Sequence, residues 1–205
     1  MLTDADLRLP PFVPGMRIGL FGGSFDPPHA GHLAVSAVAL RALRLDRVWW
    51  LVSPHNPLKP AAPADIAARI AAARQIITDR RIAATGIEAA LGSVYTAETL
   101  RRLLPRLPGI HAVWLMGADS FAGFHRWRDW RTIAASLPIA VFNRPDWALP
   151  ALSSPAALAL RRSRLNESDA PALASLTPPA WTFLPSPSVN TSSTALRKTP
   201  RRRAS

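Results

Sequence analysis

Cysteine is absent from the 205-residue sequence, so disulfide bonds, thiolate metal sites and a cysteine nucleophile are all excluded. No apolar run approaches the roughly 18–20 residues that a membrane-spanning helix needs. Residues 1–14 contain two aspartates and three prolines, which is not the pattern of a secretory signal. We therefore expect a cytoplasmic protein with no membrane partner.

Acidic residues are scarce: 13 Asp and Glu stand against 25 Lys and Arg, and the net charge is +12 at pH 7. Such a balance favours an anionic partner, which is either nucleic acid or a phosphorylated small molecule. Five of the bases lie in the last nine residues, at positions 197, 198, 201, 202 and 203. We interpret residues 198–205 as a basic disordered tail, and favour a solubilising role for it over contact with nucleic acid or another polyanion.

Strand-like and helix-like patterns alternate along the chain, and hydrophobic residues make up 48% of it. The alternation predicts an α/β fold, a Rossmann-like parallel sheet with helices on both faces, in a single domain over 16–197. Residues 1–15 are interpreted as an extended leader and 145–187 as a long loop rich in proline and serine. Whether the chain forms a homo-oligomer is left open. Strands are expected at 17–21, 47–52, 82–85, 110–116, 138–142 and 181–184, and helices at 31–44, 64–77, 96–104, 129–136 and 192–197.

Ligands of parallel α/β sheets bind at the carboxyl ends of the strands. Four expected strand ends, at 22–32, 53–59, 117–120 and 143–146, are rich in Gly, Pro, His, Asn, Asp or Lys. The chemistry is therefore expected at this edge of the sheet.

The first strand end has the composition of a phosphate site. Gly22 and Gly23 let a backbone approach a ligand, and His29 and His32 lie three residues apart at an expected helix start. The amides and dipole of a helix N-terminus also favour an anion. Two alternatives are a purely structural pair of helix-capping histidines and a zinc site using Asp26, His29 and His32.

The segment Gly22 to Leu33, GGSFDPPHAGHL, resembles the (T/S)-F-D-P-x-H-x-G-H signature of the nucleotidyltransferase superfamily. Further segments resemble those of bacterial nicotinate-nucleotide adenylyltransferases: YTAETL from 95, LMGADS from 115, a tryptophan at 127, FNRP from 142 and NTSSTALR from 190. Their order and spacing also agree, and the resemblance runs from about residue 16 to 197.

The resemblance implies a Rossmann-like fold that transfers the adenylyl group of ATP to nicotinate mononucleotide, with release of pyrophosphate, in NAD biosynthesis. It implies that the catalytic residues are His29 and His32, that Mg²⁺ arrives with ATP, and that the protein itself holds no metal. The implied ATP-binding residues are Gly22, Gly23, Ser24, Phe25, His29, His32, Gly117, Asp119, Arg144, Ser192, Ser193 and Arg197. The implied contacts to the second substrate are Lys59, Thr96 and Trp127.

Each of these residues also has a structural interpretation. Asp119 is suited to ribose hydroxyls and equally to capping a helix. Ser192, Ser193 and Arg197 could hold phosphates or simply begin a helix, and Lys59 could be a solvated loop residue. Trp127, three residues from two other aromatics, could belong to the core. Nicotinamide mononucleotide and pantetheine phosphate remain alternative acceptors, and nucleic-acid binding remains the non-enzymatic alternative.

Overall fold

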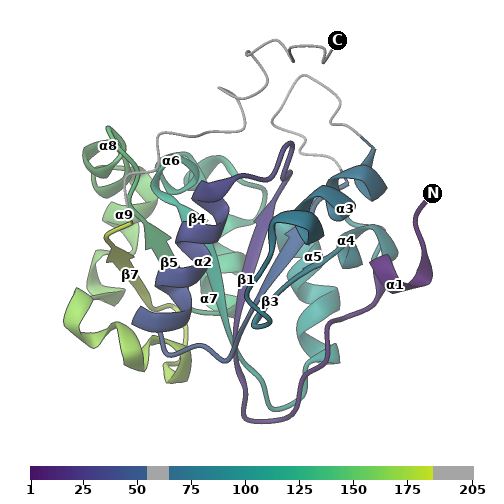
Figure 1. The fold of residues 1–205 in the computed structure, drawn as a ribbon. Helices are drawn as coiled ribbons and strands as arrows, with labels where there is room; N and C mark the ends of the chain where they lie inside the picture. The colour runs from purple at the N-terminus through teal and green to yellow at the C-terminus, as the bar shows by residue number, and fades with distance from the viewer. Residues whose placement is uncertain (55–64, 187–205) are drawn as a thin grey trace, which may run out of the picture.

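The computed structural model describes residues 1–54 and 65–186 of the chain. Within them, seven strands form one parallel sheet in the order β3-β2-β1-β4-β5-β7-β6 (Figure 1). The strands are β1 (Arg17–Gly23), β2 (Arg47–Val52), β3 (Ile82–Thr85), β4 (His111–Gly117), β5 (Ile139–Phe142), β6 (Arg164–Leu165) and β7 (Trp181–Leu184). The direction of winding reverses at β1, because β2 and β3 lie on one side of it and β4 on the other.

Alternate residues of the central strands enter two separate hydrophobic clusters, one on each face of the sheet. In β2, for example, Trp49 and Leu51 join one cluster, while Trp50 and Val52 join the other. Strands buried on both faces read as continuous apolar runs, which explains the segment RVWWLV.

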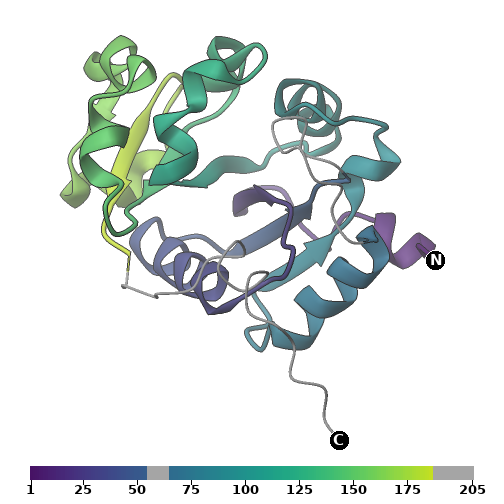
Figure 2. The same cartoon turned by 90° about the horizontal axis from the view of Figure 1, so that it is seen from above.

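Helices cover both faces of the sheet (Figures 1 and 2). One face is packed by α2 (Ala30–Ala42), α3 (Ile66–Ile76) and the 3₁₀ helix η4 (Glu167–Ser175). The other face is packed by α4 (Ile87–Ala90), α5 (Thr96–Leu103), η1 (Leu104–Arg106), α6 (Ala118–Ala122), η2 (Phe124–Arg126), α7 (Trp130–Ser136), α8 (Ala148–Leu152) and α9 (Pro155–Ala159). The short η3 (Arg161–Ser163) precedes β6. None of the helices in the described parts has the length and apolar character that crossing a bilayer requires.

The predicted fold class is confirmed: the chain is α/β, with a parallel sheet between two helical layers. The strands expected at 47–52, 82–85 and 181–184 have the bounds that the apolar runs indicated. The short helices α4 and α6 were not predicted, because segments of four or five residues carry too little periodicity. The helix expected at 192–197 and the tail at 198–205 lie outside the described residues.

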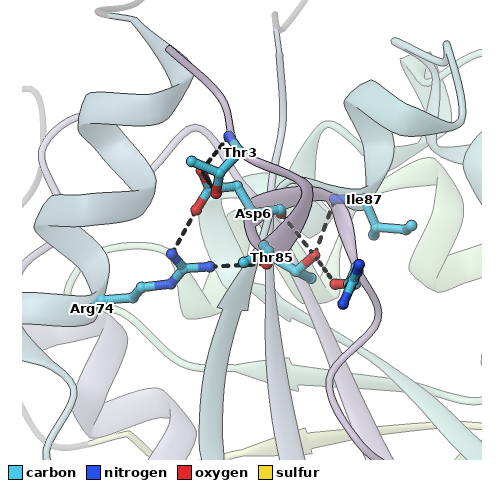
Figure 3. Close-up of polar contacts among 7 residues, drawn as sticks. Thr3, Asp6, Arg74, Thr85 and Ile87 are labelled. Carbon is cyan, nitrogen blue, oxygen red and sulfur yellow. Dashed lines mark hydrogen bonds and ion pairs between the residues drawn. The ribbon is translucent and has the colours of Figure 1, made fainter.

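The leader differs from the extended segment predicted for residues 1–15. It contains the helix α1 (Asp4–Leu7), in which the Asp6 carboxylate accepts hydrogen bonds from the Thr3 amide and hydroxyl. Asp6 also pairs with Arg74 of α3 at 2.5 Å, and its carbonyl accepts from the Gly86 amide beyond β3 at 2.7 Å (Figure 3). Thr85 bridges the same contact by donating to the Arg8 carbonyl and accepting from the Ile87 amide. The leader therefore packs against the rest of the domain. The sequence did not predict this contact, because the leader has no apolar periodicity.

The segment 145–187 also differs from the predicted long loop, since it contains α8, α9, η3, β6 and η4. Each element has nine residues or fewer, and Pro171 lies inside η4. Buried apolar residues such as Ala151, Ala156 and Leu173 pack these elements against the two clusters. The prediction failed because such short elements are stabilised by tertiary packing rather than by their own pattern.

Candidate active site

The candidate site lies at the carboxyl edge of the sheet, around the reversal between β1 and β4. Crevices at such reversals are where open α/β sheets bind ligands, because the loops that follow the two strands diverge there. The loops after β1, β4 and β5 meet this edge, and Ser53 and Pro54, the first residues after β2, lie beside the end of β1.

His29 and His32 lie at the start of α2, and their ring centroids are 3.9 Å apart. His29 Nδ1 accepts the Gly31 amide hydrogen, and His32 Nδ1 accepts the His29 amide hydrogen, both at 3.1 Å. The capping alternative is therefore realised through one nitrogen of each ring. Because each Nδ1 acts as an acceptor, the proton of a neutral ring resides on Nε2, which is a donor suited to a phosphate oxygen.

The His29 side chain is held neutral at physiological pH. Only 6% of the residue is exposed, and burial, assisted by the nearby positive charge of Arg144, lowers the pKa of His29 to about 4. A neutral imidazole with a committed Nδ1 can donate a hydrogen bond to an anion without titrating near pH 7. A donor of this kind is suited to a site that binds phosphate groups.

Aromatic side chains fix the orientation of His32. Its ring packs 4.7 Å from Phe25 and 5.7 Å from Trp50, and Phe25 stacks on Trp50 at 4.9 Å. Trp50 Nε1 donates to Ser36 Oγ, which in turn donates to the His32 carbonyl. Rings packed in this way have few alternative rotamers, so the histidine pair is preorganised.

The glycines after β1 have a packing role in the fold. A Cβ on Gly22 would lie 2.6 Å from the Trp114 ring, and a Cβ on Gly23 would lie 3.2 Å from Phe25. The space that a side chain would occupy at these two positions is therefore filled by aromatic side chains of the fold. Packing against Trp114 is a sufficient reason for glycine at position 22, and contact of the two glycine backbones with a nucleotide stays a prediction.

Asp119 and Arg144 form an ion pair at 3.1 Å, with about a third of each side chain exposed. Asp119 lies in the first turn of α6, whose N-cap is Gly117, so the capping alternative does not apply to Asp119. A Cβ on Gly117 would collide with the Asp119 carboxylate and lie 3.3 Å from Arg144 Nε. Gly117 therefore gives room for this pair, which joins the ends of β4 and β5.

Thr96 and Trp127 each adjoin, in the sequence, one member of a contacting pair of residues. Thr96 is the first residue of α5, and Trp127 caps the end of η2. The neighbouring residues Arg128 and Tyr95 are in contact, with the guanidinium 4.8 Å from the ring centroid. Trp127 is half-buried and packs edge-on against Phe124, so it is partly a core residue and partly accessible.

Ser24 and Phe25 lie in the loop between β1 and α2, where Ser24 is half-buried and Phe25 has a positive φ of 46°. Four of the predicted residues, Lys59, Ser192, Ser193 and Arg197, lie outside the described residues. The zinc alternative gains no support: in the described parts of the chain, Asp26, His29 and His32 do not form a metal-binding group.

Two buried ionisable residues near this edge were not predicted. Arg69 of α3 donates to carbonyls in the loops after β1 and β2. Glu88 of α4 accepts a hydrogen bond from Thr99, and burial raises the pKa of Glu88 to about 7. The signal in the sequence that could have indicated these two buried residues was a charged residue within an apolar segment.

A sequence profile described as cytidylyltransferase-like matches residues 20–199. A probable nicotinate-nucleotide adenylyltransferase of Methylorubrum extorquens (strain PA1) is 57% identical over 185 residues, covering 89% of this chain and 99% of the relative. One of Cereibacter sphaeroides (strain ATCC 17025 / ATH 2.4.3) is 53% identical over 186 residues, covering 91% and 99%.

The fold is similar to that of a Plasmodium falciparum nicotinic acid mononucleotide adenylyltransferase solved with NaAD. The TM-score is 0.65 at 16% identity, with 89% of this chain and 83% of that chain covered. The profile, the identity to full-length relatives and the shared fold agree. The chain therefore belongs to the nicotinate-nucleotide adenylyltransferases of the cytidylyltransferase-like family.

Proposed function

We propose that this chain transfers the adenylyl group of ATP to nicotinate mononucleotide, giving nicotinate adenine dinucleotide and pyrophosphate, as a step of NAD biosynthesis. The observation that carries the proposal is the buried His29–His32 pair at the start of α2, with each Nδ1 committed to a backbone amide. Membership of the family supports the choice of substrates. The reaction would take place in the cytoplasm.

In this proposal, the histidines bind the triphosphate and stabilise the transferring group. A phosphate oxygen of the mononucleotide attacks the α-phosphorus of ATP, and the bond from that phosphorus to the β-bridging oxygen breaks. Negative charge is redistributed over the equatorial oxygens of the α-phosphate and onto the leaving pyrophosphate. Donors held in fixed positions, such as Nε2 of His29 and His32, stabilise this charge without any covalent intermediate.

The other predicted residues take supporting roles. Asp119 would bind a ribose hydroxyl, and Arg144, held against it, would keep its remaining donors for phosphate or base. Thr96 and Trp127, on neighbouring elements, would flank the pyridine ring. The remaining proposed contacts are Gly22, Gly23, Ser24, Phe25 and Gly117 to the nucleotide, Ser192, Ser193 and Arg197 to the leaving phosphates, and Lys59 to the second substrate.

Magnesium would enter with ATP and neutralise charge on the phosphate oxygens. Mg²⁺ prefers oxygen ligands, whereas the donors gathered at this edge are mainly nitrogen groups of His29, His32 and Arg144. The Asp119 carboxylate is already paired with Arg144. This donor set fits a triphosphate that carries its own ion, so we propose that the phosphates supply most of the magnesium ligands.

An acceptor panel tests the proposal. The purified chain is mixed with ATP and Mg²⁺, and pyrophosphate release is measured with nicotinate mononucleotide, nicotinamide mononucleotide or pantetheine phosphate. We expect the highest kcat/KM with nicotinate mononucleotide. A clear preference for either of the other acceptors would contradict the assignment of substrate, and no release with any of them would contradict the assignment of activity.

A further inference from the structure

Arg69 is a buried, positively charged residue to which the proposed reaction gives no role. It lies in the N-terminal half of α3, a helix composed mostly of alanine and isoleucine, and 3% of the residue is exposed. Its Nη1 donates to the carbonyls of Ser24 at 2.6 Å and Ser53 at 2.8 Å, and its Nη2 donates to the Pro54 carbonyl at 3.2 Å. One side chain therefore binds the backbone at three points.

The three carbonyls belong to two different loops of the candidate site. Ser24 follows β1, and Ser53 and Pro54 follow β2. The parallel ladder between these strands ends at the pair Gly23 and Val52. The Ser53 amide still donates to the Gly23 carbonyl at 2.9 Å. Beyond that hydrogen bond, Arg69 links the two chain segments through the carbonyls of Ser24 and Ser53. Arg69 thus joins the two loops at the position where the sheet stops holding them.

The loop after β1 needs such support, because the residue after Ser24 is in an unfavourable backbone conformation. Phe25 has a φ of 46°, in the left-handed region that side chains other than glycine rarely adopt. Its ring is fully buried between Trp50 and His32. A shift of the Ser24 carbonyl would therefore move the Phe25 ring, and with it the surface that orients His32.

We propose that Arg69 is a positioning residue for adenylyl transfer, which ties the loop after β1 to Ser53 and Pro54 at the end of β2 so that His32 is held in its productive orientation. The inference rests on the proposed function, because it gives Arg69 a role in that reaction. Arg69 touches backbone carbonyls, so it acts through the loop and through Phe25.

The chemistry of the side chain supports this role over a purely stabilising one. Burial lowers the pKa of the Arg69 guanidinium, and the carboxylates of Asp26 and Asp65 oppose that shift. Buried charges often contribute little net stability, because desolvation offsets their interactions. A planar guanidinium can reach carbonyls of two loops at once, whereas an ammonium is a single point donor. The observed contacts use that geometry.

The test compares Arg69→Met and Arg69→Lys with a matched variant, Arg74→Met. Arg74 lies on the same helix, but its side chain is 45% exposed and pairs with Asp6 of the leader. Melting temperatures and circular dichroism establish the fraction folded. ATP affinity by calorimetry, and kcat and KM for both substrates, are then measured well below the melting transition.

We expect Arg69→Met to lower kcat by about 100-fold per folded molecule, the loss typical of a small misplacement of catalytic groups. Arg69→Lys should recover part of this loss, and Arg74→Met should lower the melting temperature with kcat unchanged. If Arg69→Met lowers only the melting temperature and leaves kcat and KM within threefold of the original chain, the proposal is overturned.

The outcomes separate the two proposals. If Arg69→Met does not fold, the test rests on Arg69→Lys. A folded lysine variant with normal kinetics overturns the positioning role, whereas a folded lysine variant with kcat at least fivefold lower supports it. If the original chain shows no adenylyl transfer, the proposed function fails. In that event the ATP affinity alone tests Arg69, since a displaced loop should weaken binding at least tenfold and an unchanged affinity would overturn the inference.

Discussion

The guanidinium of Arg144 lies 3.1 Å from the carboxylate of Asp119, across the ends of the neighbouring strands β5 and β4. The same positive charge contributes to the low pKa of His29, which comes from the loop after β1. Arg144 therefore links the histidine pair electrostatically to Asp119, which follows β4. This connection makes the protonation state of His29 depend on a residue 115 positions away in sequence.

Arg144→Met should raise the pKa of His29 above about 4, because the repulsion of one positive charge is removed. The value should stay below the ordinary 6.5, since burial, which is the larger cause, remains. The pKa is measured by NMR titration of the imidazole Cε1 proton. The exposed His111 at the start of β4 serves as an internal control. An unchanged His29 titration would show that Arg144 does not act on this ring.

His32→Ala should lower kcat by about 100- to 1,000-fold while the fold survives, because one preorganised donor to the transferring phosphate is lost. Steady-state pyrophosphate release with ATP and nicotinate mononucleotide measures the effect. His111→Ala provides the matched control, since this histidine is exposed at the opposite edge of the sheet and should leave kcat unchanged. Near-normal turnover of the His32 variant would refute the role given to the pair.

Glu88→Gln should stabilise the protein increasingly as pH rises. Burial raises the pKa of Glu88 in the folded state from 4.5 to about 7, so between these values the unfolded chain loses a proton that the folded chain keeps. The Glu88 contribution to stability is complete below pH 4.5 and is lost as pH rises through 7. Glutamine keeps an acceptor for the Thr99 hydroxyl without this loss. Urea unfolding at pH 5 and pH 8 measures the difference, and a gain that does not grow with pH would contradict it.

Asp6→Asn should lower the free energy of unfolding by about 1–2 kcal/mol, because charge-assisted hydrogen bonds to Thr3 and Arg74 are weakened. These bonds, chiefly those from Thr3, lower the pKa of Asp6 in the folded state. The stabilisation is therefore present above pH 3.8 and is lost as pH falls below it. Urea unfolding at pH 7 and pH 3 measures both effects. Kinetic constants per folded molecule should not change, since α1 lies away from the histidine pair.

Local patterns predicted the fold class and the long elements well. The apolar, β-branched and aromatic segment RVWWLV predicted a strand, and the structure places it second from the edge of the sheet. Patterns failed where elements were short, as in α1, α8 and α9, because a helix of one turn is stabilised by what it packs against. The docking of α1 on Arg74 and Gly86 is such a case.

The sequence by itself determined which residues are candidates for the site. A motif such as GGSFDPPHAGHL is contiguous, so its glycines, prolines and histidines must meet wherever the chain folds. The order of the strands, their contact partners and the neighbours of each side chain are long-range properties that no contiguous pattern encodes. Only the tertiary structure therefore decided that Trp114 fills the space beside Gly22, that Arg144 pairs with Asp119, and that Arg69 holds two loops together.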